Sequence, residues 1–431
     1  MLYIKNVQQL DSTGQLVPVE VFVRDGIIES IGQDLSDSLS IQGEAVEIID
    51  GQNGLLTPGL IDLHVHLREP GFTDKETVES GSKAAARGGF TTVCAMPNVT
   101  PVPDNAGVLA DMVALNTKDG LIKVEQYATI SKNLNSETEL VDFESLVQAG
   151  AVAFTNDGVG VQTAGLMYQA MQQAAALDKP IVAHTEDNSL LFEGVMHEGK
   201  RNKELGLPGM LSLTESTQIA RDILLAEATG CHYHVCHVSA KESVRVIRDA
   251  KRAGIRVTCE VAPHHLILSE NDIPGDDALY KMNPPLRSNE DREAMIEGLL
   301  DGTIDCIATD HAPHTELDKQ GGFLNSPFGI TGSEIAFQLL YTEFVRPGIF
   351  SLKQVVDWLT IRPAELFKLD AGTMNVGETA NLAIFDLENA YKVNVEDFAS
   401  KSVNTPFIGK TLFGETLYTL YQGQTVYQKT R

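Results

Sequence analysis

The sequence lacks any apolar run long enough to span a bilayer and any low-complexity stretch. Residues 1–5 lack the basic and long apolar regions of a signal peptide, so we expect a cytoplasmic protein. Positive charge is also scarce: 33 Lys and Arg stand against 59 Asp and Glu, a formal net charge of -26. Nucleic acids and acidic membranes would meet like charge here, and we expect neither as a partner. A small anionic substrate is not excluded, because it responds to the local field of its pocket.

The sequence also lacks CxxC pairs. Its five cysteines are Cys94, Cys231, Cys236, Cys259 and Cys306, an odd number without an export signal. This pattern predicts reduced thiols. All five lie in apolar, strand-like segments, so we interpret them as core residues and not as metal ligands.

The two ends of the chain share a strand-and-turn pattern. Alternating segments joined by tight turns occur at 19–31 and return at 380–385 and 418–423. A chain of 431 residues is long enough for one large domain and a smaller one. We therefore predict a β-sandwich domain built from residues 1–56 and 366–431.

The middle of the chain, residues 57–365, alternates strand-like and helix-like patterns. Apolar strands are expected at 57–67, 89–96, 122–130, 150–156, 180–185, 231–238, 255–262 and 304–309. Helical patterns lie between most of them, at 76–87, 166–177, 217–228, 241–253 and 289–300. Eight such repeats predict an α/β fold, a (β/α)8 TIM-like barrel, with a doubly wound open sheet as the alternative. A barrel would carry its chemistry at the C-terminal ends of the strands.

Polar residues gather at those predicted ends. The first strand ends in His64, His66 and Arg68, which share one face because side chains alternate along a strand. Later strand ends contribute Asn98, Asp157, His184, His237, and Asp310 with His314. Each could be structural by itself: Asp157 lies in an Asn-Asp-Gly turn, and His184 could simply end its strand. Their combination in barrel order favours a functional site.

Four histidines and two aspartates of this set form a candidate metal site: His64, His66, His184, His237, Asp157 and Asp310. Mixed imidazole and carboxylate ligands suit zinc, and also manganese, cobalt or iron. Six groups exceed one tetrahedral site, which favours two metals bridged by Asp157. Two such ions would generate a hydroxide at neutral pH and polarise a carbonyl. Asp310 could both bind a metal and transfer a proton.

The remaining histidines are mostly interpreted as structural. If His237 faces the barrel axis, strand alternation predicts that His232 and His234 face the helices. His311 is structural beside Asp310 by the same argument, and His197 has the surroundings of a surface residue. For His264 and His265, core and site interpretations both stay open.

Three segments carry a resemblance to a known family: PGLIDLHVHLREPG at 58–71, AMPN at 95–98 and ATDHAPH at 308–314. They resemble the motifs of dihydroorotases in the amidohydrolase superfamily, and the similarity runs essentially end to end. The resemblance implies reversible interconversion of N-carbamoyl-L-aspartate and (S)-dihydroorotate, the ring-closing step of pyrimidine synthesis.

The resemblance also implies roles for single residues and two zinc ions per subunit. His64, His66 and Asp310 would hold the more buried ion, His184 and His237 the second, with Asp157 as bridge. Many superfamily members bridge with a carboxylated lysine on the fourth strand. This chain has none there and resembles the branch that uses aspartate, although Asn156 stands where relatives often have a second acid. The implied substrate contacts are His66, Arg68, Asn98, Asn283, His314, Phe328 and Gly329.

Two other functions remain as alternatives. Hydantoinases and allantoinases share the barrel and the histidines, but they need no identical set of residues to bind a carboxylate. Arg68, Asn98 and His314 together favour a substrate that carries one. A non-catalytic dihydroorotase-like scaffold would be expected to have lost metal ligands, and all six are present here. The resemblance further suggests a homo-oligomer, and some relatives associate with aspartate transcarbamoylase. The residues themselves leave that association open.

Overall fold

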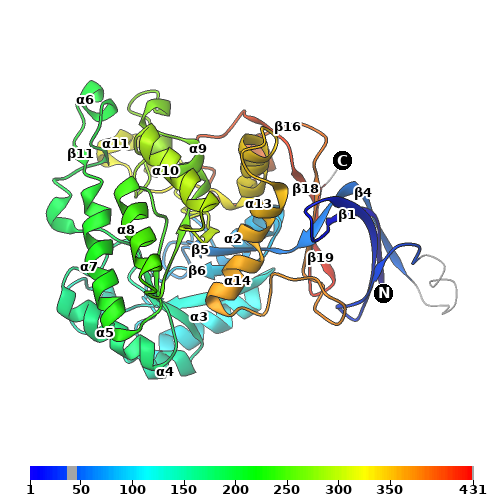
Figure 1. Cartoon of the computed structure of the whole chain (residues 1–431), viewed down its shortest axis with the longest axis horizontal. Helices are drawn as coiled ribbons and strands as arrows, with labels where there is room; N and C mark the ends of the chain where they lie inside the picture. The colour runs from blue at the N-terminus through cyan, green and yellow to red at the C-terminus, as the bar shows by residue number, and fades with distance from the viewer. Residues whose placement is uncertain (36–45, 430–431) are drawn as a thin grey trace.

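The computed structural model describes residues 1–35 and 46–429 and contains two large sheets (Figure 1). One has eight strands and is surrounded by helices, and the other has seven strands and contains both ends of the described chain. Within the described residues, no helix combines the length and apolarity needed to cross a membrane.

The eight-stranded sheet is the predicted barrel, with its strands in sequence order around the sheet. All paired neighbours are parallel. A parallel bridge between Val65 and His311 joins the first strand to the segment after the last, which brings the two edges together. The strands are β5 Leu60–Val65, β6 Phe90–Ala95, β7 Lys123–Ala128, β8 Ala151–Thr155, β9 Ile181–Ala183, β12 Tyr233–Val235, β13 Val257–Val261 and β14 Cys306–Ile307. Each lies inside a predicted strand, so the barrel prediction is confirmed and the open sheet is wrong.

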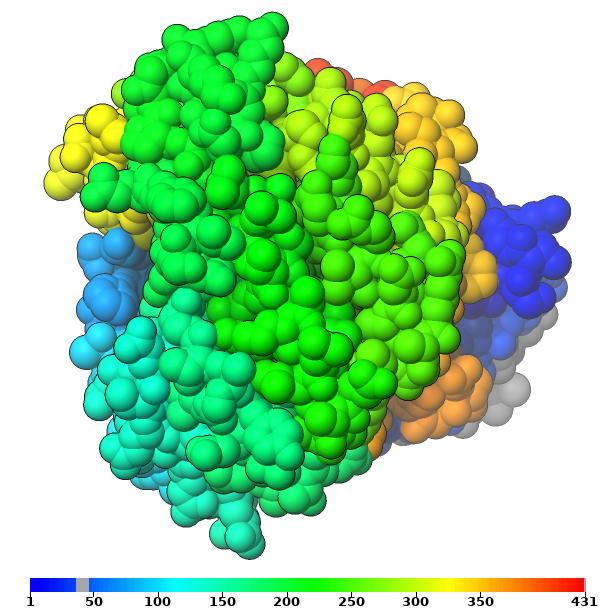
Figure 2. All heavy atoms as spheres, turned by 60° about the vertical axis from the view of Figure 1, so that its left-hand side comes forward, coloured from blue at the N-terminus to red at the C-terminus, as the bar shows by residue number. Residues whose placement is uncertain are grey.

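Helices follow the strands and form the outer wall. They are α2 Val78–Arg87, α3 Ala106–Asp119, α4 Phe143–Gln148, α5 Ala164–Ala176, α7 Leu213–Thr229, α8 Lys241–Arg252, α10 Asn289–Leu300, α13 Leu352–Leu359 and α14 Ile361–Phe367. Figure 2 shows the green part of this wall as a continuous surface, with the blue N-terminal strands at one side. Several helices begin at side-chain caps, such as Thr77 and Ser288, which satisfy amide groups of the first turn.

The seven-stranded sheet joins strands from both termini, as predicted. Its strands are β1 Leu2–Leu10, β2 Leu16–Arg24, β3 Ile27–Gly32, β4 Glu47–Pro58, β15 Leu382–Asp386, β18 Glu415–Tyr421 and β19 Gln424–Gln428. Strand β4 pairs with N-terminal β1 on one side and C-terminal β15 on the other. Because β4 runs directly into β5, the sheet and the barrel are joined at the strand that ends in His64.

Short elements cover the C-terminal ends of the barrel strands. They are β10 Met196–His197, α6 Arg201–Leu205, β11 Gly209–Met210, α9 Pro263–Ile267, α11 Gly322–Asn325, α12 Ala336–Leu340, β16 Tyr391–Lys392 and β17 Thr411–Leu412. One apolar cluster near them includes Met196 from β10, Phe323 from α11 and Leu412 from β17. The chain after β15 therefore returns to the barrel before it rejoins the sheet at β18.

The five cysteines are all buried and unpaired, as expected for core residues. Cys94, Cys236 and Cys306 belong to the apolar cluster that contains Ile61 and Leu63, whereas Cys231 and Cys259 pack with the helices. Burial raises the pKa of the Cys236 thiol, so it stays protonated at neutral pH.

Candidate functional site

The six predicted metal ligands meet at the C-terminal ends of the barrel strands. His64 lies on β5 and His66 just after it, Asp157 follows β8, and His184 follows β9. His237 and Asp310 lie just beyond β12 and β14, and both have a positive φ, 31° and 50°. Non-glycine residues rarely adopt this backbone region, and its occurrence at two candidate ligands is typical of functional sites.

Asp157 lies at the centre of the group. Its Oδ1 is 3.4 Å from His64 Nε2, 3.7 Å from His184 Nδ1 and 3.8 Å from His237 Nε2. Its Oδ2 is 3.5 Å from His66 Nε2. Oδ1 thus faces imidazoles from both sides of the group and Oδ2 faces His66, so this carboxylate lies between all four rings.

Asp310 lies beside His64 and His66. Its Oδ1 is 3.1 Å from His66 Nε2 and 3.4 Å from His64 Nε2. Donor atoms about 2.0–2.2 Å from one tetrahedral ion lie roughly 3.4 Å from one another. The observed spacings match that value. His64, His66 and Asp310 therefore fit a metal ion, and so do His64, Asp157 and His237.

Two buried atoms in the group support the same interpretation. His64 Nε2 and Asp157 Oδ1 have no hydrogen-bond partner among the described residues. Leaving such atoms unpaired in the interior costs free energy, unless an ion or water satisfies them. His184 and His237 form the other part of the group. Their Nδ1 and Nε2 atoms lie 3.0 Å apart, and both face the Asp157 carboxylate.

The electrostatics of the cluster favour the ligand form of the carboxylates. Burial alone would raise the pKa of Asp157, but the nearby His64 and His237 hold it well below the usual value. The pKa of Asp310 is likewise lowered against burial, by His64 and His66. Both groups are therefore anionic at neutral pH, which suits metal binding and, for Asp310, proton acceptance.

Glu260 on β13 is a partner of the cluster that the sequence did not reveal. Its Oε1 accepts a hydrogen bond from His64 Nδ1 at 2.9 Å, and its Oε2 lies 3.2 Å from His234 Nε2. These imidazoles lower the pKa of Glu260 to about 2 despite its burial. The carboxylate fixes the His64 tautomer so that Nε2 presents its lone pair to the site, as outer partners of metal ligands commonly do. The sequence carried one indication of this role, because a glutamate inside an otherwise apolar strand is unusual.

The predicted orientation of His232 and His234 is wrong. Both point along the barrel interior, where they share the Thr258 hydroxyl at 2.7 and 2.8 Å and pack near Phe367. Tyr233 faces the helices instead, since its hydroxyl donates to Asp222 on α7. Strand alternation does not extend to His237, because β12 ends at Val235 and the left-handed backbone of His237 redirects its side chain.

The other histidines are buried too. His197, expected at the surface, is 7% exposed because its short strand β10 pairs with β11. His311 accepts the backbone N–H of Gly332 at 3.2 Å through Nδ1, and its structural role stays a prediction. His264 and His265 are buried, and burial lowers the pKa of both. His265 Nε2 donates to the carbonyl of Pro284 at 2.9 Å, whereas His264 Nε2 has no partner among the described residues.

A cavity of about 170 Å³ opens beside the metal ligands. This volume suits a small molecule rather than a drug-sized one. The predicted substrate contacts all border it: His66, Arg68, Asn98, Asn283, His314, Phe328 and Gly329. The structure thus brings together every residue that the resemblance implied for metal and substrate.

One wall of the cavity is cationic. Arg68 Nε donates to the carbonyl of Pro313 at 3.2 Å, and its Nη2 lies 3.3 Å from His314 Nε2. His314 Nε2 donates to the carbonyl of Phe328 at 2.8 Å, and Lys75 donates to His314 Nδ1 at 3.3 Å. Burial and the neighbouring cations lower the pKa of His314 to about 2, so the ring is neutral. The positive charge at this wall resides on Arg68, with Lys75 beside His314.

Three further predicted contacts, Asn98, Asn283 and Gly329, also line the cavity. Asn98 Oδ1 lies 2.9 Å from His66 Nδ1, which orients the ring toward the ligand cluster. Asn283 donates to Glu186 Oε2 at 2.6 Å. Gly329 has φ +126°, and a side chain there would lie 2.6 Å from the Ala312 Cβ, so only glycine fits.

Comparisons with known proteins agree with this geometry. The family model described as dihydro-orotase-like matches residues 53–243. The chain is 59% identical to a dihydroorotase of Enterococcus faecalis over 97% of each chain. It is 57% identical to a dihydroorotase of Ligilactobacillus salivarius, over 99% of this chain and 98% of the relative, and 56% identical to one of Staphylococcus epidermidis over all of both.

Solved structures with a similar fold include hydantoinases. The L-hydantoinase of Arthrobacter aurescens aligns with a TM-score of 0.87 and 27% identity over 100% of this chain and 96% of its own. The D-hydantoinase of Thermus sp. aligns with a TM-score of 0.84 and 25% identity, over 99% and 95%. These structures share the barrel and the terminal sheet, but the much higher identity is to the dihydroorotases. This chain belongs to the dihydroorotase family, the metal-dependent cyclic amidohydrolases.

Proposed function

We propose that the protein is a dihydroorotase that interconverts N-carbamoyl-L-aspartate and (S)-dihydroorotate in pyrimidine synthesis. The observation that carries the proposal is the cationic wall of Arg68 beside the candidate metal ligands. A cyclic amide with a carboxylate substituent can place its amide at the ligand cluster and its carboxylate on Arg68. The full-length similarity to proteins named dihydroorotase supports the same activity.

Two zinc ions are the proposed cofactor. His64, His66 and Asp310 would hold one, His184 and His237 the other, and Asp157 would bridge them. Imidazole and carboxylate groups together are the ligand types that suit zinc. Ions held there would supply an activated water at neutral pH and polarise the amide carbonyl.

Asp310 is the proposed acid and base. In ring opening, a C–O bond forms between water and the amide carbon, and the ring C–N bond breaks. Asp310, anionic before the reaction because its pKa is lowered, takes a proton from the water and returns it to the departing nitrogen. In ring closure the same carboxylate removes a proton from the ureido nitrogen as that nitrogen attacks the carboxyl carbon, and it returns the proton to the oxygen that leaves as water when the C–O bond breaks.

Arg68, Asn98 and His314 are the proposed clamp for the α-carboxylate. Arg68 offers the charge and donors that match a carboxylate. Asn283, Phe328 and Gly329 would contact the rest of the substrate from the opposite loops, and His66 would contact it from the metal side. Glu186, which holds Asn283 by a hydrogen bond, would fix that contact.

The test is substrate preference combined with metal content. We expect the purified protein to contain about two zinc ions per chain and to act on dihydroorotate far faster than on hydantoin or allantoin. Elemental analysis measures the zinc content, and a spectrophotometric assay measures the turnover of each substrate. Turnover of hydantoin without turnover of dihydroorotate would favour the hydantoinase alternative. Absence of turnover of dihydroorotate, hydantoin and allantoin by the metal-loaded protein would favour the non-catalytic scaffold.

The clamp is tested by Arg68→Ala. Hydrogen bonds to a charged group contribute about 1.5–3 kcal/mol, so KM for carbamoyl aspartate should rise about 10- to 100-fold with a smaller change in kcat. Steady-state kinetics with both substrates measures this. Arg256→Ala is the matched control, because Arg256 is half-exposed and pairs with Asp178 away from the cavity. An unchanged KM in the Arg68 variant would refute the clamp.

A further inference from the structure

A strand-free segment, residues 399–405, contacts the active-site loops with buried side chains. It lies between the short strands β16 and β17 in the C-terminal part of the chain. Connecting segments usually run over the surface. In this one Ser400, Ser402, Asn404 and Thr405 are between 1% and 7% exposed. Ala399 and Lys401 are exposed, so the segment runs along the surface of the site region with these four side chains turned inward, and we call it the strap.

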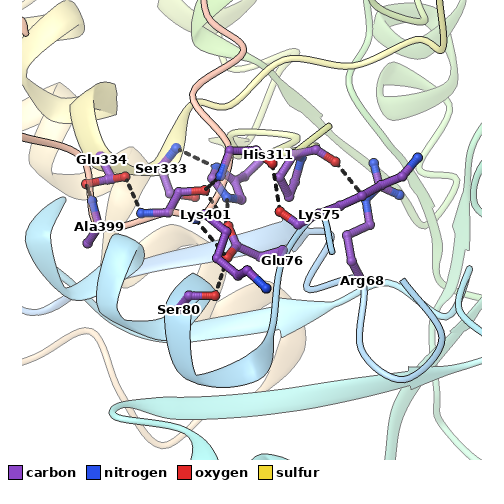
Figure 3. A network of polar contacts seen from close by, with 12 residues as sticks. Arg68, Lys75, Glu76, Ser80, His311, Ser333, Glu334, Ala399 and Lys401 are labelled. Carbon is purple, nitrogen blue, oxygen red and sulfur yellow. Dashed lines mark hydrogen bonds and ion pairs between the residues drawn. The ribbon is translucent and has the colours of Figure 1, made fainter. Parts of the chain in front are cut away.

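Two buried carboxylates hold the start of the strap (Figure 3). Glu334 accepts the backbone N–H groups of Ala399 at 2.8 Å and Ser400 at 3.0 Å. Glu76 accepts the N–H of Lys401 at 3.2 Å and the hydroxyl of Ser400. Both glutamates are at most 1% exposed. Hydrogen bonds to buried charged groups are strong, so the strap is fixed before it reaches the cavity.

The end of the strap binds two loops of the cavity through one side chain. Asn404 Oδ1 accepts the backbone N–H of His314 at 3.0 Å. Asn404 Nδ2 donates to the carbonyl of Ala312 at 3.1 Å and to that of Gly329 at 3.0 Å. The carbonyl of Asn404 accepts the N–H of Thr331 at 3.0 Å. One residue thus joins the loop that carries His314 to the loop that carries Phe328 and Gly329.

The same two loops also meet inside the cavity. His314 donates to the carbonyl of Phe328, and Arg68 donates to the carbonyl of Pro313. Asn404 is not among the residues that line the cavity, and it lies behind both loops. The loops also pair directly, since the N–H of Ala312 donates to the carbonyl of Ile330 at 2.9 Å. Asn404 adds to this pairing from outside the cavity and His314 adds to it from inside.

We propose that Asn404 is a positioning residue that sets the distance between the two loops and so shapes the subsite for the substrate's α-carboxylate. This inference rests on the proposed function for the identity of the substrate. An asparagine suits the role because its amide matches one N–H and two carbonyl groups at once. An aspartate has the same shape and would still accept the N–H of His314. Its second oxygen cannot donate, however, and would face the carbonyl oxygens of Ala312 and Gly329.

The experiment compares Asn404→Asp and Asn404→Ala with wild type and Asn116→Asp. Asn116 on α3 is a matched control, a buried amide (5% exposed) whose side chain donates to Gln126 on β7. We expect Asn404→Asp to raise KM for dihydroorotate about 10-fold or more, since small misplacements of binding groups have large effects. The alanine variant should raise KM less, and kcat should change by less than about 3-fold in both. Asn116→Asp should keep the wild-type KM.

A second readout does not depend on turnover. Leu317 and Leu324 are 77% and 57% exposed in the segment between the two loops. Chymotrypsin cleavage beside them should be faster in both Asn404 variants than in wild type or Asn116→Asp. Absence of dihydroorotate turnover in the wild type refutes the proposed function, and cleavage rates then still test the strap. Folded Asn404 variants with wild-type KM and wild-type cleavage rates overturn the inference.

Discussion

Replacement of Asp310 by asparagine should lower kcat about 10²- to 10⁴-fold while most of the bound metal is retained. Asp310 Oδ1 lies within 3.4 Å of both His64 Nε2 and His66 Nε2, and its pKa is lowered by those imidazoles. The carboxylate can therefore accept a proton at neutral pH. An asparagine amide has the same shape and can still offer an oxygen to an ion, but it cannot accept and return a proton.

Metal content separates the two roles of Asp310. Elemental analysis of the variant should give nearly the wild-type number of ions, whereas kcat in both directions of the reaction should fall together. Asp301→Asn is the matched control, because Asp301 pairs with Arg248 at the outer end of α10. Near-normal turnover by the Asp310 variant would exclude the proton-transfer role. Loss of activity that only parallels loss of metal would reduce Asp310 to a ligand.

Replacement of Asp157 by asparagine should remove at least one ion per chain and lower activity at least about 100-fold. Asp157 faces four imidazoles, with Oδ1 toward His64, His184 and His237 and Oδ2 toward His66. A neutral amide cannot offer an anionic oxygen to each of two ions. Because ligands that bind only the folded state stabilise it, the variant should also gain less thermal stability from added zinc.

The neighbouring residue supplies the control for this prediction. Asn156 accepts the backbone N–H groups of Ile130 and Ser131 through Oδ1, so its side chain points away from the cluster. Asn156→Asp keeps those acceptors and should retain both ions. Elemental analysis and thermal unfolding with and without zinc compare the two variants. Two tightly held ions in Asp157→Asn would contradict the bridge.

Much of the candidate site was predictable because it depends on local order along the chain. The eight barrel strands carry apolar runs, and in a parallel barrel the ends of consecutive strands must meet at one face. His64, Asp157 and Asp310 could therefore be grouped without knowing any distance. The same reasoning failed for His232 and His234, because alternation holds only within a regular strand and β12 has three residues.

Contacts between distant segments were not predictable in this way. Glu260 could be seen as an unusual charge in an apolar strand, but its two histidine partners lie 196 and 26 residues away. The strap gave no signal, because a coil segment has no periodicity from which burial can be inferred. His197 was misjudged for a related reason, since its burial comes from the pairing of β10 with β11.

The amino-acid sequence was sufficient to predict the strand order, the candidate metal ligands and the cationic residue proposed to distinguish the substrate. These follow from residue type and from the fixed geometry of parallel strands. Only the tertiary structure decided which carboxylate faces which imidazole, how Glu260 orients His64, and that Asn404 joins two loops of the cavity. Each of these depends on side-chain directions and on contacts between residues far apart in the chain, which packing fixes and local pattern does not.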